Sequence, residues 1–519
     1  MNFTNRLIIF FTSRRYVQYL LLLLITLSLF TYLQLDRTFA DPDSFYHAKM
    51  AEILVSQGAI TGLPWLSATT LKYNFVDHHF LYHLFLIPFV QFFSPLLGLK
   101  IATIIFASLA IMAIFWLLRQ LGIKGAFWYV LFLLTVNPFI FRLNLAKAQG
   151  LVLVFLFLTI YLLLNRRYLA LILVAGLYVW LYGGWPLVLV LAVVYGLVNW
   201  FLASFRGGWF NLRIGKIKVL LQNFWLLISA ALGLIAGLVF NPYFPKNLEF
   251  YWQQSFKIAV FNYQNFIGVG GEWYPYALAD LFFGALPFFL LFILALIVFI
   301  IFGQKQSLAG WFFLVLSLLF LSLTLKSRRY VEYFIPLALC FSALSLNVFF
   351  ELIKPRLNKL VSARLIFLSP LIILLALAPV FYRDLSLVKD SFRQGFSFDK
   401  FARASQWLKQ NSSPGEIVFH SDWDEFPLLF YHNDLNYYLV GLDPTFMYEF
   451  DQNLHQRWVK ITSGQTTADL YQTIKMIFGA SYVFVDFNQN ADFDRNLANN
   501  FYFEKVFEDQ EARIYRIIE

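Results

Sequence analysis

The sequence has little charge and almost no cysteine, and both shortages narrow the class of protein. Only 13% of the 519 residues are charged, whereas soluble globular proteins contain about 25%. So few charges cannot cover a water-facing surface of this size, which excludes a soluble globular protein. The single cysteine, Cys340, excludes a disulfide framework and a cysteine metal site.

Apolar residues take the place of the missing charge. They make up 60% of the chain, and they form runs of about 18 or more residues, long enough to cross ~30 Å of hydrocarbon. We therefore expect a mainly α polytopic membrane protein with about 11–13 transmembrane helices. The expected spans are Tyr16–Leu33 and residues 99–118, 126–141, 150–164, 168–182, 186–203, 219–240, 279–303, 309–325, 330–350 and 362–382.

The charges that are present have an uneven distribution. Residues 1–382 contain 27 Lys or Arg and 10 Asp or Glu, whereas residues 383–519 contain 13 and 20. The positive excess belongs to the membrane part, so anionic lipids explain it better than nucleic acid, and we expect no nucleic-acid partner. Arg6 and Arg14 precede the first span and place the N-terminus in the cytoplasm. An odd number of spans then puts the C-terminus outside, in an integral protein of the plasma membrane.

Two domains are expected. Residues 1–382 form the transmembrane domain with large outer loops at 36–98 and 241–278, and His79–Phe93 is placed as a surface-lying helix of the first loop. Residues 383–519 form a small extracytoplasmic α/β domain. Its expected strands are Glu416–Phe419, Tyr437–Val440, Ser481–Val485 and Arg513–Ile518.

Acidic residues gather on the outer side of this topology. Asp41 and Asp43 follow the first span directly and are candidate general bases or metal ligands. Arg328 and Arg329 fall at an outer turn, against the positive-inside tendency, and the guanidinium fork suits phosphate. Acids and an arginine pair on one membrane face indicate a reaction on a phosphate-linked lipid. The alternatives are loops that simply escape the cytoplasmic bias and arginines that contact lipid headgroups.

Several motifs then point to one family. Asp43-Ser-Phe-Tyr46-His47 resembles the first-loop motif of the oligosaccharyltransferase catalytic subunit. Further motifs resemble that family in the same order along most of the chain: Tyr182-Gly-Gly-Trp185, Glu272-Trp-Tyr-Pro275, Arg328-Arg329-Tyr-Val-Glu and Trp423-Asp424. The sequence is identified as a member of the GT-C superfamily of membrane glycosyltransferases, and it resembles the oligosaccharyltransferase branch.

The resemblance implies an activity and a set of roles. The chain would transfer a sugar or oligosaccharide from a polyprenyl phosphate or pyrophosphate to an extracytoplasmic acceptor, for which protein is a candidate. Asp43 would bind a metal and activate the acceptor, with Asp41 beside it, and Glu272 would be the loop glutamate. Arg328 or Arg329 would hold donor phosphate. Trp423 and Asp424 would contact the acceptor.

The sequence departs from the family where a second acidic metal motif is expected. Lys147 and Gln149 stand there, and neither supplies the charged oxygen that Mg²⁺ or Mn²⁺ prefers. Lys147 could provide the positive charge that a cation gives elsewhere, or Asp43 could act alone as a base. The tail motif departs too, since Asp422-Trp423-Asp424-Glu425-Phe426 lacks the family's first tryptophan, tyrosine and glycine.

Other readings stay open at this point. Within enzymes, a single-sugar GT-C transferase acting on a glycolipid or cell-surface polymer is the alternative. A lipid-linked sugar flippase or a non-catalytic scaffold belongs to another class. His79 and His83 have the i,i+4 spacing of helical zinc sites, although an interfacial helix with polar ring edges near headgroups is the favoured explanation.

Overall fold

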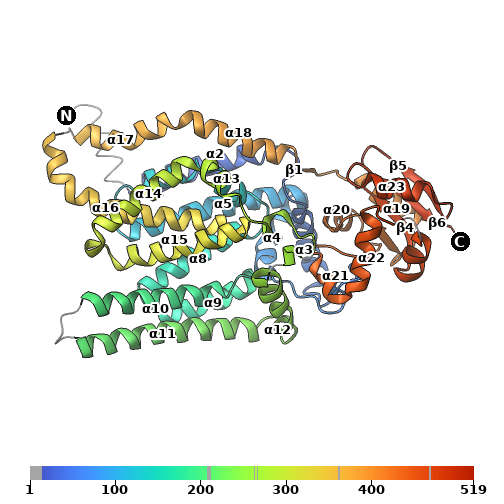
Figure 1. Ribbon diagram of the computed structural model, residues 1–519, viewed down its shortest axis with the longest axis horizontal. Coiled ribbons are helices and arrows are strands. Elements are labelled where there is room, and N and C mark those ends of the chain that lie inside the picture. Colours follow the sequence, from blue (N-terminus) through green and yellow to red (C-terminus); the bar gives the residue numbers. More distant parts are fainter. Residues whose placement is uncertain are drawn as a thin grey trace. The chain divides into compact units, whose positions relative to one another are not determined.

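The computed structural model describes residues 15–206, 212–261, 263–265, 267–360, 363–466 and 469–518 (Figure 1). The chain divides into two compact units. The helical unit contains Met1–Asp36, Ala102–Val239 and Glu272–Arg393, and the loop–tail unit contains Arg37–Ile101, Phe240–Gly271 and Gln394–Glu519. Arg6 and Arg14, on which the predicted orientation rests, lie outside the described residues.

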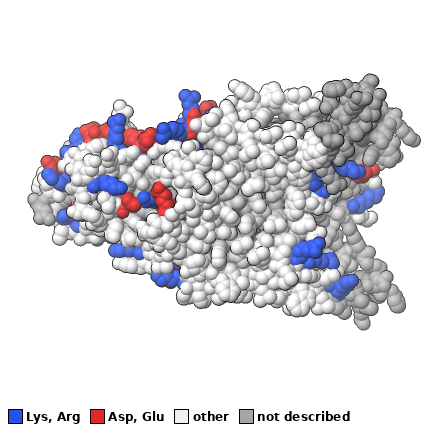
Figure 2. Space-filling model, turned by 180° about the vertical axis from the view of Figure 1, so that it is seen from behind, with Lys and Arg blue, Asp and Glu red and all other residues white. Residues whose placement is uncertain are grey.

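The helical unit consists of long apolar helices. Figure 2 shows a broad area of their surface formed by residues other than Lys, Arg, Asp and Glu. The elements are α2 (Arg15–Leu33), α5 (Pro95–Gln120), α6 (Ala126–Leu133), α7 (Asn137–Leu143), α8 (Gln149–Leu164), α9 (Tyr168–Leu181), α10 (Leu187–Arg206), α11 (Leu212–Val239), η4 (Gly271–Trp273), α13 (Leu278–Gly284), α14 (Leu286–Ile301), η5 (Gly303–Lys305), α15 (Leu308–Lys326), η6 (Arg328–Tyr330), α16 (Val331–Leu360), α17 (Ala363–Ala376) and α18 (Ala378–Arg393).

Membrane-spanning helices are confirmed. Among the described residues, six helices are long and apolar enough to cross a membrane, or up to nine if each bent pair is one span. The shorter helices α8 and α9 coincide with two further predicted segments, so each of the predicted spans has its helix or helix pair. Helix α4 (Phe80–Phe92) forms at the place predicted for a helix of the first outer loop.

Three predicted spans are broken helices. The segment 126–141 divides into α6 and α7, which meet at 80°, and α13 and α14 meet at 93°. Pro138 and Pro287 stand at the first turns of α7 and α14. A proline there lacks the N–H that a continuing helix needs, so the preceding helix ends before it. The third break separates α17 from α18 by 56°.

Helices α9 and α11 cross closely because both have small residues at their contact. A side chain at Gly233 would lie 2.3 Å from the carbonyl oxygen of Ile172, and one at Gly237 would lie 2.5 Å from that of Gly176. Gly233 and Gly237 form the small-xxx-small spacing that lets membrane helices approach through their backbones. Trp180 also donates from Nε1 to the carbonyl oxygen of Gly237 at 2.8 Å.

The loop–tail unit combines short helices with a mixed sheet. Its four-stranded sheet has the order β3-β4-β6-β5, with β3 and β4 parallel and the other pairs antiparallel. The elements are β1 (Thr38–Phe39), α3 (Asp43–Gln57), η1 (Thr70–Lys72), α4, α12 (Lys246–Tyr251), η2 (Trp252–Phe261), η3 (Tyr263–Asn265), β2 (Phe396–Ser397), α19 (Ala402–Asn411), β3 (Ile417–His420), η7 (Trp423–Glu425), α20 (Phe426–His432), α21 (Thr445–Phe450), α22 (Gln452–Thr462), η8 (Gln472–Ile477), β4 (Ala480–Val485), α23 (Ala491–Ala498), β5 (Phe503–Glu508) and β6 (Arg513–Ile517).

The predicted strands of the tail are confirmed in three of four cases, as β3, β4 and β6. Tyr437–Val440 is not a strand, because only isolated bridges form there, from Tyr437 to Ile417 and from Tyr438 to Leu66. Strand β5 was not predicted, because exposed charged residues interrupt the apolar residues of its sequence. The mainly α class with a small C-terminal sheet is nevertheless confirmed.

Residues 37–101 and the tail belong, with residues 240–271, to one compact unit, whereas the sequence predicts the tail as a separate domain. Strand β1 pairs with β2 across more than 350 residues of chain, and the N–H of Ser67 donates to the carbonyl oxygen of Tyr438 at 2.8 Å. Lys49 on α3 forms an ion pair with Asp434 at 2.9 Å. The tail thus holds helix α3, which begins at Asp43, in place.

Candidate functional site

A buried ionic cluster lies in the helical unit around Arg142. This arginine, on α7, contacts Glu272 through Nη1 at 2.5 Å and Glu332 through Nε and Nη2 at 2.9 and 2.8 Å. The Arg142 and Glu332 side chains are 7% and 2% exposed. Charges buried so deeply are stable only when they are paired, so α7 and the start of α16 are tied through this arginine.

Arg329 joins the cluster from η6. It donates from Nη1 to Glu272 at 3.2 Å and from Nη2 to the hydroxyl of Tyr182 at 2.6 Å. Its guanidinium lies over the ring of Trp273, 4.8 Å from the centroid. Gly184 allows the Tyr182 ring to fold back, because a side chain there would lie 2.5 Å from that ring. The Tyr-Gly-Gly-Trp turn therefore positions a hydroxyl for Arg329.

Backbone contacts fasten the Glu272 segment to the turn before α16. The Ser327 hydroxyl donates to the carbonyl oxygen of Glu272 at 2.9 Å, and the N–H of Arg328 donates to that of Tyr274. Arg328 itself is exposed and donates from Nε to the carbonyl oxygen of Pro275. The two neighbouring arginines thus have different environments, with Arg329 inside the cluster and Arg328 at its surface.

The electrostatics of the cluster favour an anion. Burial alone would raise the pKa of Glu272, but Arg329, Arg142 and Lys147 outweigh it and hold that pKa well below its usual range. Two guanidinium groups here share one carboxylate. Phosphate oxygens accept from arginine in the same way, so the arrangement can bind an anionic group where Glu272 now lies.

The structure brings the predicted residues Glu272 and Arg329 together and adds three that sequence reasoning missed. Arg142, Glu332 and Tyr182 complete the cluster. A signal for Arg142 was present, since an arginine that follows an apolar run within a membrane segment is costly and needs a partner. Its partners lie 130 and 190 residues away along the chain, so no local pattern could identify them.

Asp41 and Asp43, in the loop–tail unit, have different roles. The carboxylate of Asp41 accepts from the N–H of Asp43 at 3.0 Å and so forms the turn that starts α3. Asp43 is the first residue of α3 and is partly exposed. A carboxylate at that position is stabilised by the helix dipole. The two predicted acids thus differ in their backbone role, while both carboxylates are partly exposed.

The histidines near Asp77 do not form the zinc pair that the His79–His83 spacing suggested. His83 is fully buried, and its ring nitrogens bond Asp77 and His47. This burial also removes His83 from any headgroup region. Within the described part of the chain, no group of three or more His, Cys, Asp or Glu side chains is arranged to hold a metal ion.

The residues present do not fit the divalent metal site implied by the resemblance. The resemblance implies two acidic metal motifs. Asp43 supplies the acid of the first, and Lys147 and Gln149 stand where the second is expected. Lys147 adds positive charge near Glu272 instead of an anionic oxygen. Magnesium and manganese need several oxygen ligands, and this donor set does not supply them.

The predicted acceptor residues Trp423 and Asp424 lie in a capped turn of the tail. Asp422 accepts from the N–H of Asp424, and Glu425 accepts from the N–H of Asp422, which together form a capping box. The Trp423 side chain packs against the hydrophobic core of the sheet. Turn chemistry thus explains Asp422 and Glu425, while Asp424 stays partly exposed.

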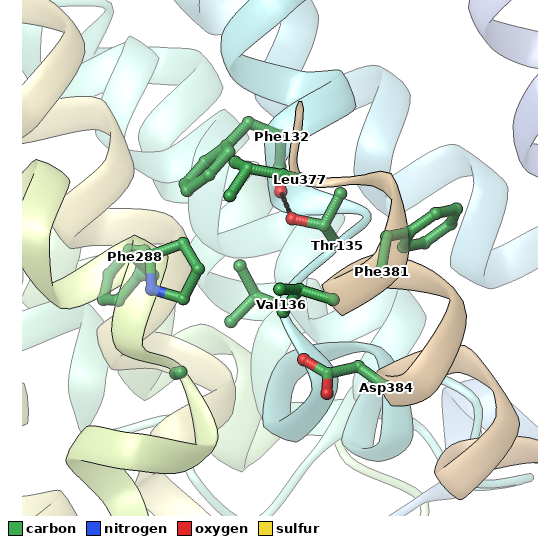
Figure 3. Close-up of a pocket in the computed structure, with 10 residues that line it drawn as sticks. Phe132, Thr135, Val136, Phe288, Leu377, Phe381 and Asp384 are labelled. Atoms are coloured by element: carbon green, nitrogen blue, oxygen red, sulfur yellow. Dashed lines mark hydrogen bonds between the residues drawn. The ribbon is translucent and has the colours of Figure 1, made fainter. Parts of the chain in front are cut away.

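The helical unit also has a small crevice where its three helix breaks converge (Figure 3). Thr135, Ala285 and Leu377, one from each break, line it. Irregular backbone at membrane depth is tolerated where protein buries it. None of the predicted site residues lines this crevice, whose other walls are Phe132, Val136, Pro287, Phe288, Val380, Phe381 and Asp384.

Comparison with known proteins defines the class of fold. No family model matches the sequence, and no curated protein matches it. Solved structures of GT-C membrane glycosyltransferases, however, superpose on nearly the whole chain. The chain therefore has the GT-C fold, which confirms the predicted fold class.

Three solved proteins show this similarity. The Archaeoglobus fulgidus oligosaccharyltransferase in its apo form has a TM-score of 0.64 at 15% identity, with 98% of this chain and 75% of that chain covered. ArnT from Cupriavidus metallidurans, bound to undecaprenyl phosphate, has 0.56 at 13% identity, covering 97% and 98%. The mycobacterial arabinofuranosyltransferase AftD has 0.51 at 12% identity, covering 98% and 40%. At these identities the likeness concerns the fold alone.

Proposed function

We propose that the chain is an integral membrane glycosyltransferase that moves a sugar or oligosaccharide from a polyprenyl phosphate or pyrophosphate to an extracytoplasmic acceptor. The observation that carries this proposal is the buried cluster in which Arg329 and Arg142 share the Glu272 carboxylate. An arginine pair held in a membrane protein of GT-C fold suits the phosphate of a lipid-linked donor.

On the donor side, Arg329 binds phosphate and Arg328 and Lys147 add positive charge. When the bond between sugar and phosphate breaks, its electron pair leaves with the phosphate oxygen, and fixed cations stabilise that charge. Solved structures of the same fold support this class of ligand. One structure of AglB, the Archaeoglobus fulgidus oligosaccharyltransferase, contains a dolichol-phosphate, and the structure of ArnT contains undecaprenyl phosphate.

On the acceptor side, Asp43 removes the proton of the attacking group. Its partly exposed carboxylate is held at the first turn of α3, where a general base can reach a substrate. Asp41 positions Asp43 through the turn before the helix. In this proposal Asp43 acts without a metal ion, since the surrounding residues do not fit one, although one structure of the archaeal enzyme contains zinc.

The transmembrane domain is proposed to end near residue 382, with the N-terminus in the cytoplasm and the outer loops and tail outside. This orientation brings the loop–tail unit, which contains Asp43, to the side on which extracytoplasmic acceptors occur. Membrane lipids surround the long apolar helices. Protein acceptors, as in oligosaccharyltransferases, are the first candidate class, with Trp423 and Asp424 as acceptor contacts.

A single-sugar transferase acting on a glycolipid or polymer is the second candidate. The capped turn at Asp422–Glu425 favours it, because that turn explains the tail motif without a bound peptide. The lipid-linked flippase and the non-catalytic scaffold have no such supporting observation.

Transfer assays in membranes test the proposed function. Polyprenyl-linked donors would be supplied to the wild type, Asp43→Asn and Asp41→Asn, and products would be resolved by mass spectrometry. We expect Asp43→Asn to lower the rate by about 10²–10⁴-fold, as for loss of a general base, and Asp41→Asn to lower it less. The product mass identifies protein or glycolipid as acceptor. Equal rates in the wild type and Asp43→Asn, with both folded, would contradict the proposal.

A further inference from the structure

A hydrogen-bonded chain of three titratable side chains is buried beside Asp43 in the loop–tail unit. His47 on α3 contacts His83 on α4 from Nδ1 to Nε2 at 2.8 Å, and Nδ1 of His83 contacts Asp77 at 2.6 Å. His47, His83 and Asp77 are 2%, 0% and 2% exposed. Helices α3 and α4 pack against each other (Figure 1), so the chain links their two buried faces.

The direction of these hydrogen bonds follows from the carboxylate. An ionised Asp77 only accepts, so Nδ1 of His83 must donate to it. Its other oxygen accepts from the N–H of His79 at 3.0 Å, which fixes the carboxylate. Nε2 of a neutral His83 then accepts from Nδ1 of His47. The chain thereby sets the tautomer of His47, whose Nε2 becomes the nitrogen that can take a proton.

The same positions also accommodate one additional proton. A proton that enters at Nε2 of His47 allows the proton on its Nδ1 to pass to Nε2 of His83. His83 then becomes an imidazolium whose charge lies beside Asp77, at the same 2.6 Å contact. No heavy atom needs to move, because donor and acceptor merely exchange roles between His47 and His83. A purely structural contact could be made by apolar side chains, without burying three titratable groups.

Asp43 and His47 lie four residues apart on α3. Side chains at this spacing share one face of a helix, with Cβ atoms about 5–6 Å apart. Asp43 is partly exposed, while His47 is buried one turn further along. A proton taken up by Asp43 at the surface therefore has a neighbouring acceptor in the interior.

Four titratable groups around this chain keep one protonation state. Burial, and then the charge of Asp77, raise the pKa of Tyr46, Tyr243 and Tyr251 above the ordinary value. Burial lowers the pKa of His432, on the neighbouring α20, to about 4. All four therefore stay neutral between about pH 5 and 8. The rings of His79 and Tyr82 also lie against that of His47, and the ring of His78 lies against that of His79.

We infer that Asp77, His83 and His47 form a proton relay that serves Asp43 during transfer, which rests on the glycosyl transfer proposed above. As the acceptor forms its bond to the sugar carbon and the phosphate leaves, the acceptor's proton passes to Asp43. It then moves to His47 and the charge settles on His83, beside Asp77, until the products leave and the proton returns along the same positions through Asp43 to water. Asp43 is thus returned to its ionised form within the site. His47, His83 and Asp77 are positioning residues that act through Asp43.

Two measurements on the full-length protein in membranes test the relay. The first compares the pH profile of transfer for the wild type, His47→Gln, Asp77→Asn and the control His78→Gln. We expect His47→Gln to lower kcat about 100-fold and to leave the KM for the polyprenyl donor unchanged. Asp77→Asn removes the anion that stabilises imidazolium, so the acid limb of its profile moves to lower pH. His78→Gln changes neither parameter.

The second measurement does not depend on activity. Nitrogen-15 spectra of histidine-labelled protein report the tautomer of each of the seven histidines, and Asp77→Asn should shift two of them. Wild-type kcat and pH profile in folded His47→Gln would overturn the relay while leaving the transferase intact. Unchanged spectra in Asp77→Asn would overturn it as well. If the wild type transfers no sugar, the proposed function fails, and the spectra still decide whether the hydrogen-bonded chain exists.

Discussion

Two buried polar clusters among the described residues differ in the kind of side chain that carries positive charge. In the helical unit, Arg142 and Arg329 are permanently charged and neutralise Glu272 and Glu332. In the loop–tail unit, His47 and His83 form a hydrogen-bonded chain with Asp77, and imidazole is a side chain that can carry a proton or release it. Fixed positive charge suits a phosphate that stays anionic throughout, whereas titratable rings suit a proton that must move. The proposed function therefore places donor chemistry at the arginine cluster and acceptor chemistry at the histidine chain.

The largest effect is expected from breaking the ionic cluster at its centre. Arg142→Gln leaves the Glu332 carboxylate, which is 2% exposed, without its partner. Removing one member of a buried pair costs about 3–5 kcal/mol, which thermal unfolding of the purified protein would measure. The control is Lys124→Gln, which breaks the exposed pair with Glu351 and should cost less than about 1 kcal/mol. Equal losses in both variants would show that the cluster is not a stabilising centre.

The next effect separates the two neighbouring arginines. We expect Arg329→Gln to lower sugar transfer by about 10²–10³-fold, because it removes a preorganised donor aimed at developing charge. Arg328→Gln should have a smaller effect, since Arg328 is exposed and lies outside the cluster. Initial rates at saturating donor would test this order. A larger loss in Arg328→Gln would place the phosphate at the surface arginine instead.

A third effect concerns the Glu272 carboxylate, which is bound by both arginines. Glu272→Gln removes the carboxylate that Arg329 and Arg142 share, so free polyprenyl phosphate should bind about tenfold more tightly, or ~1.4 kcal/mol. Transfer should nevertheless fall if Glu272 also acts in the reaction. Ligand titration in detergent would measure the affinity. Weaker binding in Glu272→Gln would mean that Glu272 orients the arginines and does not compete with phosphate.

The smallest effect is expected from pH on donor binding. The pKa of Glu272 is depressed by its arginines, so its ion pairs are present above its ordinary pKa and persist until the pH falls through the lower folded value. Donor affinity should therefore change little between about pH 7 and 5. Transfer should decline toward low pH more than affinity does, because the proposed relay must accept a proton during the reaction. A parallel decline of affinity and rate would remove the distinction between the two groups.

The sequence predicted those features that depend on neighbouring residues in the chain. Spans such as Tyr16–Leu33 follow from long apolar runs, and Asp43 and Arg329 stood out because acids and paired arginines are rare in such a chain. The helix breaks at Pro138 and Pro287 were not predicted, because membrane helices tolerate proline when their neighbours satisfy the backbone.

Long-range partners account for most of what the sequence did not show. Arg142 meets Glu332 over 190 residues, and His47 meets His83 over 36. The spacing of His79 and His83 suggested a metal pair, yet each ring's partner is set by how α3 packs on α4. In the same way, β1 pairs with β2 and joins residues near 38 to the tail. The amino-acid composition of the two segments does not predict this pairing.

Binding of undecaprenyl phosphate tests the division of roles most directly, because it needs no knowledge of the acceptor. Native mass spectrometry would compare the wild type, Arg329→Gln and Asp43→Asn at the same lipid concentrations. The account predicts at least about tenfold weaker binding, ~1.4 kcal/mol, in Arg329→Gln and wild-type binding in Asp43→Asn. Equal affinity in the wild type and Arg329→Gln, with both folded, would contradict the assignment of the arginine cluster to donor phosphate.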